Sequence, residues 1–470
     1  MRQEYLVEKY TCKIKSLFAH LQDALLARKG VVAYIPIIVV TICMFCGTSW
    51  LIFWSAADPA RYQCYALTFW LGSNATNLLP VAQCQFLNIS AAQPPFHMLP
   101  IEYPPLTLLP FSLALLVPLA YYQWAFALLM SFVSVLIYWL LLRYGPRGAA
   151  LMFAVYMFIG ALALAQVRFD LIPAALTLLC VIAAERKHWT SAYVALAFGV
   201  LLKIYPILLL PALFMAEQQA GGKLHMPAKP LTLKWVPYHF WYTLKGAGRW
   251  NWKNCLIFLG IVLGVTGVFA LLNFQEAVAS QFSYFMQRPI QIESTGNTLL
   301  WLATHVGIPL KIVYSYGSLN SISPLSAAVS LVGTLCFGLG CLYVFWQQWC
   351  RRFDITQAAI ALLFVFVATG KVFSPQYLIW LMPLLVYAGA FDVFWLLFWG
   401  AISLLTTFIY IFMYSHVLRP ELIQSVPGFF ETASVRNMFF VFVTLAYLFN
   451  WFQSRRRRRL PSLPMLRETP

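Results

Sequence analysis

Long apolar stretches alternate with short polar ones along almost the whole chain. Stretches such as 31–54 and 325–349 are close to the roughly 20 residues that a helix needs to cross the hydrocarbon core of a bilayer. The pattern therefore predicts an all-α polytopic transmembrane bundle of about 12 spans. We expect the other spans at 123–142, 148–166, 171–184, two short segments within 190–216, 254–273, 355–370, 377–389, 393–414 and 435–452.

Two stretches do not fit a plain span. Leu109-Pro110 and Val117-Pro118 interrupt the first part of 105–144, so we expect 105–119 to be a juxtamembrane helix lying along the outer interface. Segment 190–216 has to leave and re-enter the cytoplasmic side. A helix broken near residues 203–206 and lining a cavity would allow this.

The composition supports a membrane protein. Hydrophobic residues make up 61% of the chain and charged residues 10%, against about 45–50% and about 25% in soluble domains. These values exclude an ordinary soluble enzyme, and they exclude disorder, which requires low hydrophobicity and high charge.

The net charge of +17 would indicate nucleic-acid binding in a soluble chain, but here most of it reports topology. Most of the 32 Lys and Arg lie in 1–30, 217–253, the tail and three short turns, which the positive-inside rule assigns to the cytoplasm. Charges within a span are costly and normally face a cavity. The cations that remain are the candidates for binding an anion: Arg61, Arg168, Lys203, Arg288, Lys311, Lys371, Arg419 and Arg436.

The predicted organisation has three parts. A cytoplasmic N-terminal segment (1–30) precedes one transmembrane domain (31–453), and a basic cytoplasmic tail (454–470) follows. The transmembrane domain has outer loops 55–122 and 274–324 and a cytoplasmic loop 217–253. Cys64 and Cys84 share the first outer loop, as a disulfide or as two free thiols.

Asp58 is the first candidate for chemistry, because it lies directly after the first span. A carboxylate at the membrane–water boundary is a suitable general base, since partial burial makes it a stronger proton acceptor. The alternative is that Asp58 only starts a turn before Pro59 or caps a helix. Arg168 and Asp170 pose a similar choice between a site and a local ion pair joining two helix ends.

Five cations are expected on one face of the bundle together with a few carboxylates. Such a face suits a lipid-linked phosphate that carries a sugar, because the cations hold the phosphate and a carboxylate activates the acceptor. The outer loops contain no Asp-x-Asp or Glu-x-Asp pair, so we predict a site without metal. The five cations are Arg61, Arg168, Lys203, Arg288 and Lys371.

The order of these motifs resembles that of the GT-C membrane glycosyltransferases, and within them glycosyltransferase family 87, the polyprenyl-phosphate-mannose-dependent α-mannosyltransferases. The motifs that carry the resemblance are Asp58 with Tyr62, Glu102-Tyr103-Pro104-Pro105-Leu106, Arg168 with Asp170, Leu202-Lys203-Ile204-Tyr205-Pro206, Arg288 to Ser294, Phe373-Ser374-Pro375-Gln376-Tyr377 and Trp380-Leu381-Met382-Pro383.

The resemblance implies an inverting hexosyltransferase of the bacterial plasma membrane, and we expect no cofactor. The positive-inside rule and the even number of spans place both termini in the cytoplasm. The enzyme would move a sugar, typically mannose, from a polyprenyl phosphate to a hydroxyl of a lipid or glycan on the outer face, with Asp58 as base. Charge placement together with the resemblance assigns the donor phosphate to Arg288, Lys203, Lys371 and Arg168. The other substrate-binding candidates are Tyr62, Arg61, Glu102, Tyr103, Asp170, Glu293, Gln376 and Tyr377.

Two alternatives remain open at this point. A transporter or flippase for an anionic lipid-linked solute would use the same cations, although it should show two related halves, and the chain has no convincing internal repeat. A non-catalytic protein that only binds a lipid-linked sugar would also fit.

Overall fold

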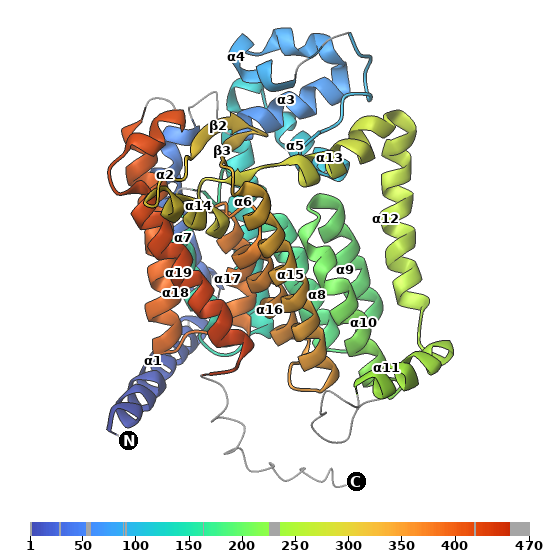
Figure 1. The fold of residues 1–470 in the computed structure, drawn as a ribbon, viewed down its shortest axis with the longest axis vertical. Helices are drawn as coiled ribbons and strands as arrows, with labels where there is room; N and C mark the ends of the chain where they lie inside the picture. Colours follow the sequence, from blue (N-terminus) through green and yellow to red (C-terminus); the bar gives the residue numbers. More distant parts are fainter. Residues whose placement is uncertain are drawn as a thin grey trace.

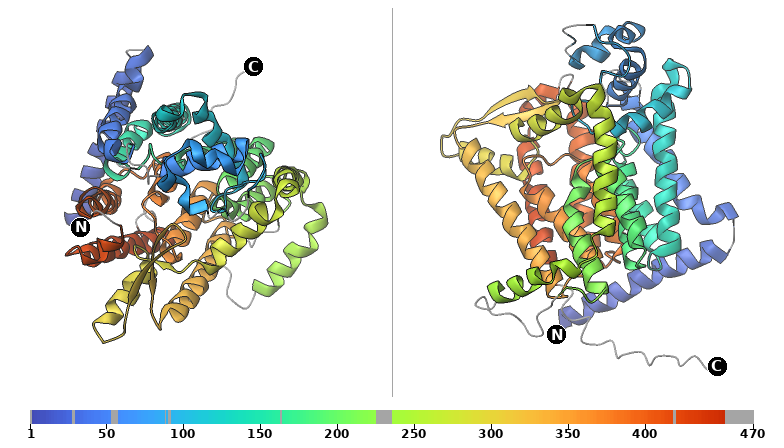
Figure 2. Two further views of the ribbon diagram at one scale, coloured as in Figure 1. Left: turned by 90° about the horizontal axis from the view of Figure 1, so that it is seen from above. Right: turned by 90° about the vertical axis from the view of Figure 1, so that its right-hand side faces the viewer.

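The computed structural model describes residues 2–27, 30–52, 58–87, 89, 92–162, 164–224, 236–417 and 420–451. The basic tail at 454–470, Arg419 and part of the 217–253 loop lie outside these ranges. The described chain is a bundle of roughly parallel helices with smaller elements at one end (Figure 1). Helix α1 (Arg2–Ala27) lies across the opposite end of the bundle (Figure 2).

Each apolar stretch expected to span the membrane contains a helix. Within the described ranges, six helical segments are long and apolar enough to cross a bilayer, among them α12 and α15, while helices such as α7 and α17 are shorter. The helices that lie in the expected spans, long and short together, are α2 (Ile35–Ile52), α6 (Tyr122–Tyr144), α7 (Ala149–Gly160), α8 (Leu171–Glu185), α9 (Trp189–Leu202), α10 (Leu209–Ala220), α12 (Lys253–Leu272), α15 (Ser326–Trp349), α16 (Ile355–Thr369), α17 (Tyr377–Tyr387), α18 (Val393–Phe408) and α19 (Phe429–Leu448).

Position in the bundle explains the two length classes. The short helices α8, α16 and α17 are buried along most of their length, whereas only 6% of the spanning windows of α12 and α15 is buried. A helix that is apolar on all sides is stable either inside a protein or against lipid. The short helices therefore form the core, and α12 and α15 present apolar surface at the periphery (Figure 2, left).

The helix break expected near residues 203–206 is present. α9 ends at Leu202, Lys203 is extended, and a 3₁₀ turn (Tyr205–Leu208) leads into α10. Pro206 occupies the first turn of that 3₁₀ segment, where its missing N–H leaves no helical hydrogen bond unmade.

The first outer segment is more ordered than the loop we expected before residue 105. It contains α3 (Asp58–Leu71) and the short α4 (Val81–Cys84), which the Cys64–Cys84 disulfide joins. The expected juxtamembrane helix is present as the apolar segment Pro105–Leu116, with α5 (Leu108–Leu113) at its centre and a 3₁₀ turn at each end. The short α3 was missed because its polar and aromatic residues lack a long apolar run.

The second outer segment also departs from a simple loop. It contains α13 (Ser280–Gln287), β1 (Ile290–Gln291), α14 (Thr295–Thr304), β2 (Lys311–Ser315) and β3 (Ser318–Ile322). The strands form an antiparallel sheet in the order β1-β3-β2. Tyr316 and Gly317 join β2 to β3 with φ of 52° and 65°, as in the two-residue turns that favour tight hairpins.

Candidate active site

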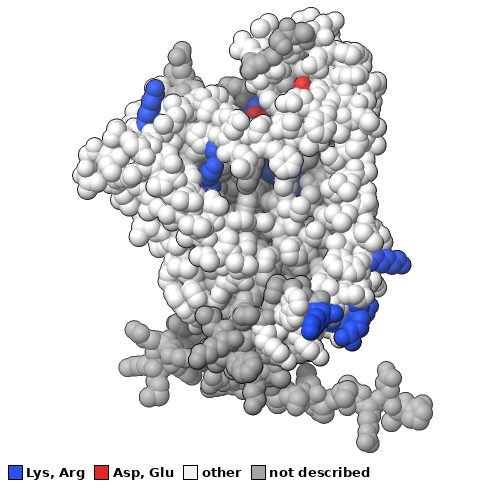
Figure 3. All heavy atoms as spheres, turned by 45° about the vertical axis from the view of Figure 1, so that its right-hand side comes forward, with Lys and Arg blue, Asp and Glu red and all other residues white. Residues whose placement is uncertain are grey.

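A cavity of about 1670 Å³ opens at the end of the bundle that carries α3 and the β2–β3 hairpin. On the face shown in Figure 3, Lys and Arg side chains surround a hollow in the upper half and gather again near the lower end. Most of the predicted site residues line the cavity, although they are far apart in sequence: Asp58, Arg61, Glu102, Tyr103, Arg168, Lys203, Arg288, Glu293, Lys371, Gln376 and Tyr377.

Asp58 begins α3 and faces Arg168 across the cavity wall. Arg168 Nη2 lies 2.6 Å from Asp58 Oδ2, and both side chains are 16% exposed. The ion pair therefore holds the Asp58 carboxylate at the cavity wall.

Arg168 and Asp170 do not form the local ion pair that was the alternative interpretation. Asp170 is fully buried, and its Oδ1 accepts hydrogen bonds from Lys203 Nζ at 2.5 Å and from Trp380 Nε1 at 2.6 Å. Asp170 Oδ2 is buried without a hydrogen-bond partner among the described residues. Asp170 thus lies behind the cavity wall and fixes two residues that line it.

Trp380 is the centre of an aromatic stack beside Lys203. The rings of Tyr205 and Trp380 are 4.0 Å apart and nearly parallel, and Tyr377 stacks on Trp380 at the same centroid distance. Lys203 Nζ lies 5.2 Å from the centre of the Trp380 ring. A cation over an aromatic face is stabilised electrostatically, so the stack and Asp170 together hold the ammonium group at the cavity.

Arg61 and Glu102 form a second ion pair, with Arg61 Nη2 2.5 Å from Glu102 Oε1. The Arg61 guanidinium also lies over the Phe86 ring at 4.4 Å. Tyr103, next to Glu102, lines the cavity as predicted, and burial raises the pKa of its phenol well above the usual value. The Tyr103 phenol is therefore neutral and keeps its proton.

Tyr62 was predicted to bind substrate, but it does not line the cavity. It is 1% exposed and stacks on Phe111, with ring centroids 4.2 Å apart and an interplanar angle of 6°. Its position makes it a support between α3 and the juxtamembrane helix that contains α5.

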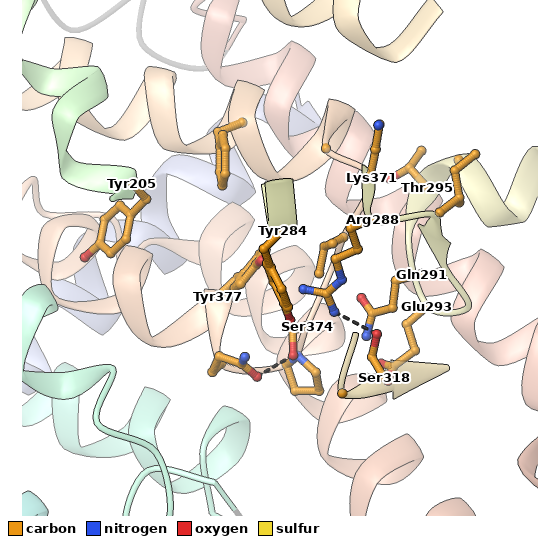
Figure 4. Close-up of a pocket in the computed structure, with 18 of the residues that line it drawn as sticks. Tyr205, Tyr284, Arg288, Gln291, Glu293, Thr295, Ser318, Lys371, Ser374 and Tyr377 are labelled. Carbon is orange, nitrogen blue, oxygen red and sulfur yellow. Dashed lines mark hydrogen bonds between the residues drawn. The ribbon is translucent and has the colours of Figure 1, made fainter. Parts of the chain in front are cut away.

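Arg288 and Lys371 lie on another part of the cavity and, among the described residues, have no carboxylate within ion-pair distance (Figure 4). Arg288 Nη2 donates to Ser318 Oγ at 2.8 Å, and Arg288 Nε is buried without a partner in the described chain. Lys371 Nζ donates to the Met286 carbonyl at 3.3 Å. Both cations thus retain donors for an external anion.

Glu293 lines the cavity, but its oxygens are already bound. Oε2 lies 3.1 Å from Arg436 Nη1, and Oε1 accepts a hydrogen bond from Tyr414 at 3.1 Å. Arg436, on α19, is fully buried and also donates to the Glu293 carbonyl at 2.6 Å. Arg436 was among the cations singled out in the sequence, and it serves to anchor the segment after β1.

The remaining predicted residues lie near the start of α17. Gln376 lines the cavity and its side chain accepts a hydrogen bond from Ser374, while Tyr377 belongs to the aromatic stack (Figure 4). Sequence reasoning missed Tyr284, Ser318, Tyr410 and Tyr414, which also line the cavity. They carry no charge and stand in no motif, so the sequence offered no signal for them.

No group of three or more His, Cys, Asp or Glu residues in the described chain has an arrangement that could hold a metal ion. A metal-free reaction remains a prediction.

No family model matches the sequence, and no curated protein matches it. Among solved structures, the chain is similar to the crystal structure of ArnT from Cupriavidus metallidurans bound to undecaprenyl phosphate. The identity is 12% and the TM-score 0.41, over 88% of this chain and 76% of ArnT. The likeness at this level is partial, so we argue function from the residues of this chain.

Proposed function

We propose that the chain is an integral membrane inverting glycosyltransferase that moves a sugar from a polyprenyl-phosphate donor to an acceptor hydroxyl on the outer face. The observation that carries the proposal is one cavity lined by five basic side chains with Asp58 at its wall. The resemblance in sequence suggests mannose as the sugar and a lipid or glycan as the acceptor.

We assign the phosphate of the lipid-linked sugar to the cations that have N–H groups without a hydrogen-bond partner. The buried Nε atoms of Arg61, Arg168 and Arg288 have no hydrogen-bond partner among the described residues. Buried donors of this kind are costly unless a ligand or water satisfies them, and guanidinium groups suit phosphate oxygens. Lys203 and Lys371 add positive charge on the same cavity.

An apolar part of the cavity wall fits a lipid carrier. Val329, Val332 and Phe337 of the peripheral helix α15 line it, as do Ile204 and Ile207 beside the helix break. An apolar wall that continues toward the lipid-facing side of the bundle favours a donor whose phosphate carries a hydrocarbon chain over a water-soluble sugar nucleotide.

The proposed reaction is a single displacement. The acceptor hydroxyl oxygen forms a bond to the anomeric carbon as the bond from that carbon to the phosphate oxygen breaks. The electron pair leaves on the phosphate, and the hydroxyl proton passes to Asp58. Phosphate is a good leaving group, so Arg288 and its neighbouring cations need only stabilise the developing negative charge.

We also propose that the cavity faces the outside of a bacterial plasma membrane and that both termini lie in the cytoplasm. Basic side chains near the opposite end of the bundle agree with the positive-inside rule (Figure 3). External labelling of single cysteines should reach position 311 on β2 and should not reach position 245 on α11 (Val236–Lys245). The reverse pattern would refute the orientation.

The test of function uses purified protein in liposomes with labelled polyprenyl-phosphate-mannose and a lipid acceptor. We expect labelled sugar on the acceptor and free polyprenyl phosphate in equal amounts. A panel of other lipid-linked sugars identifies the donor if mannose is not transferred. Movement of intact donor between leaflets with no transfer from any donor would instead establish the transporter alternative.

A further inference from the structure

The β2–β3 hairpin covers part of the cavity. Tyr314, Gly317, Ser318 and Leu319 all line it, and the hairpin lies at the same end of the bundle as α3 (Figure 1). β3 also pairs with β1, directly after Arg288. The hairpin is therefore tied to the segment that carries the cation without a carboxylate partner.

The turn of the hairpin contacts the Arg61–Glu102 ion pair. A Cβ atom added to Gly317 would lie 3.0 Å from both Arg61 Nη1 and Glu102 Oε1. Tyr284 donates a hydrogen bond to the Tyr316 carbonyl at 2.8 Å, which fixes the turn from the other side. The glycine is needed twice, for its φ of 65° and for this close approach.

Buried polar groups fix the direction of the Ser318 hydroxyl. Asn320 is fully buried, and its Nδ2 donates to Ser315 O at 2.6 Å and to Ser315 Oγ at 3.0 Å. Its Oδ1 is thus left to accept the Ser318 hydroxyl hydrogen at 3.1 Å. With its hydrogen engaged, Ser318 Oγ offers a lone pair to Arg288 Nη2 at 2.8 Å.

Two contacts therefore determine the orientation of the Arg288 guanidinium. Arg288 Cζ lies 5.4 Å from the centre of the Tyr284 ring, and the hydrogen bond to Ser318 Oγ directs Nη2 (Figure 4). Its buried Nε has no partner in the described chain. A guanidinium binds phosphate best when its donors are held in one geometry before the ligand arrives.

We propose that Ser318 is a positioning residue that orients Arg288 for the donor phosphate, and that the hairpin holds it there by seating Gly317 on the Arg61–Glu102 pair. This inference rests on the proposed function. The hairpin then connects the Arg61–Glu102 ion pair on one side of the cavity with Arg288 on the other.

The test is a double-mutant cycle read out as binding of undecaprenyl phosphate in detergent, which does not depend on turnover. Ser318→Ala should weaken binding by about two- to tenfold, the weight of one hydrogen bond. In an Arg288→Ala background the same change should have no further effect, because the residue it positions is gone. Ser283→Ala, an exposed serine on α13, is the matched control and should bind like wild type.

The outcomes separate the two proposals. Ser318→Ala could weaken undecaprenyl phosphate binding equally in the wild-type and Arg288→Ala backgrounds, or not weaken it at all. Either result would overturn the positioning role and leave the proposed function standing. A wild-type protein that does not bind undecaprenyl phosphate would overturn the proposed donor class and this inference with it.

A pair of glycine variants tests the seat of the hairpin. Gly317 and Gly307 both have positive φ, but a Cβ at Gly307 would meet nothing within 4 Å. Gly317→Ala should therefore weaken undecaprenyl phosphate binding more than Gly307→Ala, at comparable melting temperatures. Equal binding by the two variants would refute the contact between the turn and the ion pair as the cause.

Discussion

The two sides of the cavity differ in how their charges are satisfied. On the side of α3 and the helix break, each cation has a carboxylate: Arg168 with Asp58, Arg61 with Glu102 and Lys203 with Asp170. On the side of the second outer segment, Arg288 and Lys371 contact only uncharged groups among the described residues. The first side is internally neutralised and the second is not.

This difference assigns separate tasks to the two sides. Buried ion pairs fix side chains in place, because breaking one leaves an uncompensated charge. A cation without such a partner is stabilised when an anion enters from outside. Under the proposed function, the paired side holds the base Asp58 in place and offers the free Nε donors of Arg61 and Arg168, whereas the unpaired side supplies the stronger attraction for the phosphate.

The largest effect is expected at the base. Asp58→Asn keeps the shape of the side chain but cannot accept the acceptor proton, so transfer should fall by about 10²–10⁴-fold. Binding of undecaprenyl phosphate should change little. Asp354→Asn, which alters the N-cap of α16, is the control and should transfer normally. Full activity of Asp58→Asn would exclude Asp58 as the base.

Breaking a pair on the neutralised side should lower stability. Asp170→Asn leaves the Lys203 ammonium without its negative partner, at a cost of about 3–5 kcal/mol. The melting temperature in detergent should fall clearly. Asp392→Asn, at the N-cap of α18, should not lower it, because Asn caps a helix as well as Asp. An unchanged melting temperature for Asp170→Asn would show that this pair is not structural.

Removing the cation on the unpaired side should affect the donor without unfolding the protein. Arg288→Ala should raise the KM for the lipid-linked donor by roughly tenfold to a hundredfold, since hydrogen bonds to a charged group contribute about 1.5–3 kcal/mol. The melting temperature should stay near that of wild type. Lys311→Ala removes an exposed lysine of β2 and serves as control. A large loss of stability in Arg288→Ala with an unchanged KM for the donor would show that Arg288 has a structural role and does not bind the phosphate.

The smallest effect is expected at Lys371. Its amine donates one hydrogen bond at an exposed position, so Lys371→Gln should raise the donor KM by no more than about fivefold, or about 1 kcal/mol. The effect should shrink as salt concentration rises. A loss as large as that of Arg288→Ala, and insensitive to salt, would assign Lys371 a direct bond to the phosphate.

The sequence was sufficient for the long apolar helices of the bundle and for the candidate cations. Apolar length is a local property, so α12 and α15 could be placed without knowledge of their neighbours. The break near residues 203–206 followed from topology, because segment 190–216 has to leave and re-enter the cytoplasmic side within 27 residues. Subtracting the basic residues that report topology left eight cations, and five of them line the cavity.

The partners of those charges were decided only by the tertiary structure. Arg168 contacts Asp58 and not Asp170, which is two residues away, and Asp170 binds Trp380 from 210 positions further along the chain. The sheet also could not be predicted from the sequence, because β1 has two residues and no alternating pattern of polar and apolar positions. Hydrophobicity along a chain fixes which segments become helices, whereas pairing between distant side chains depends on how those helices pack.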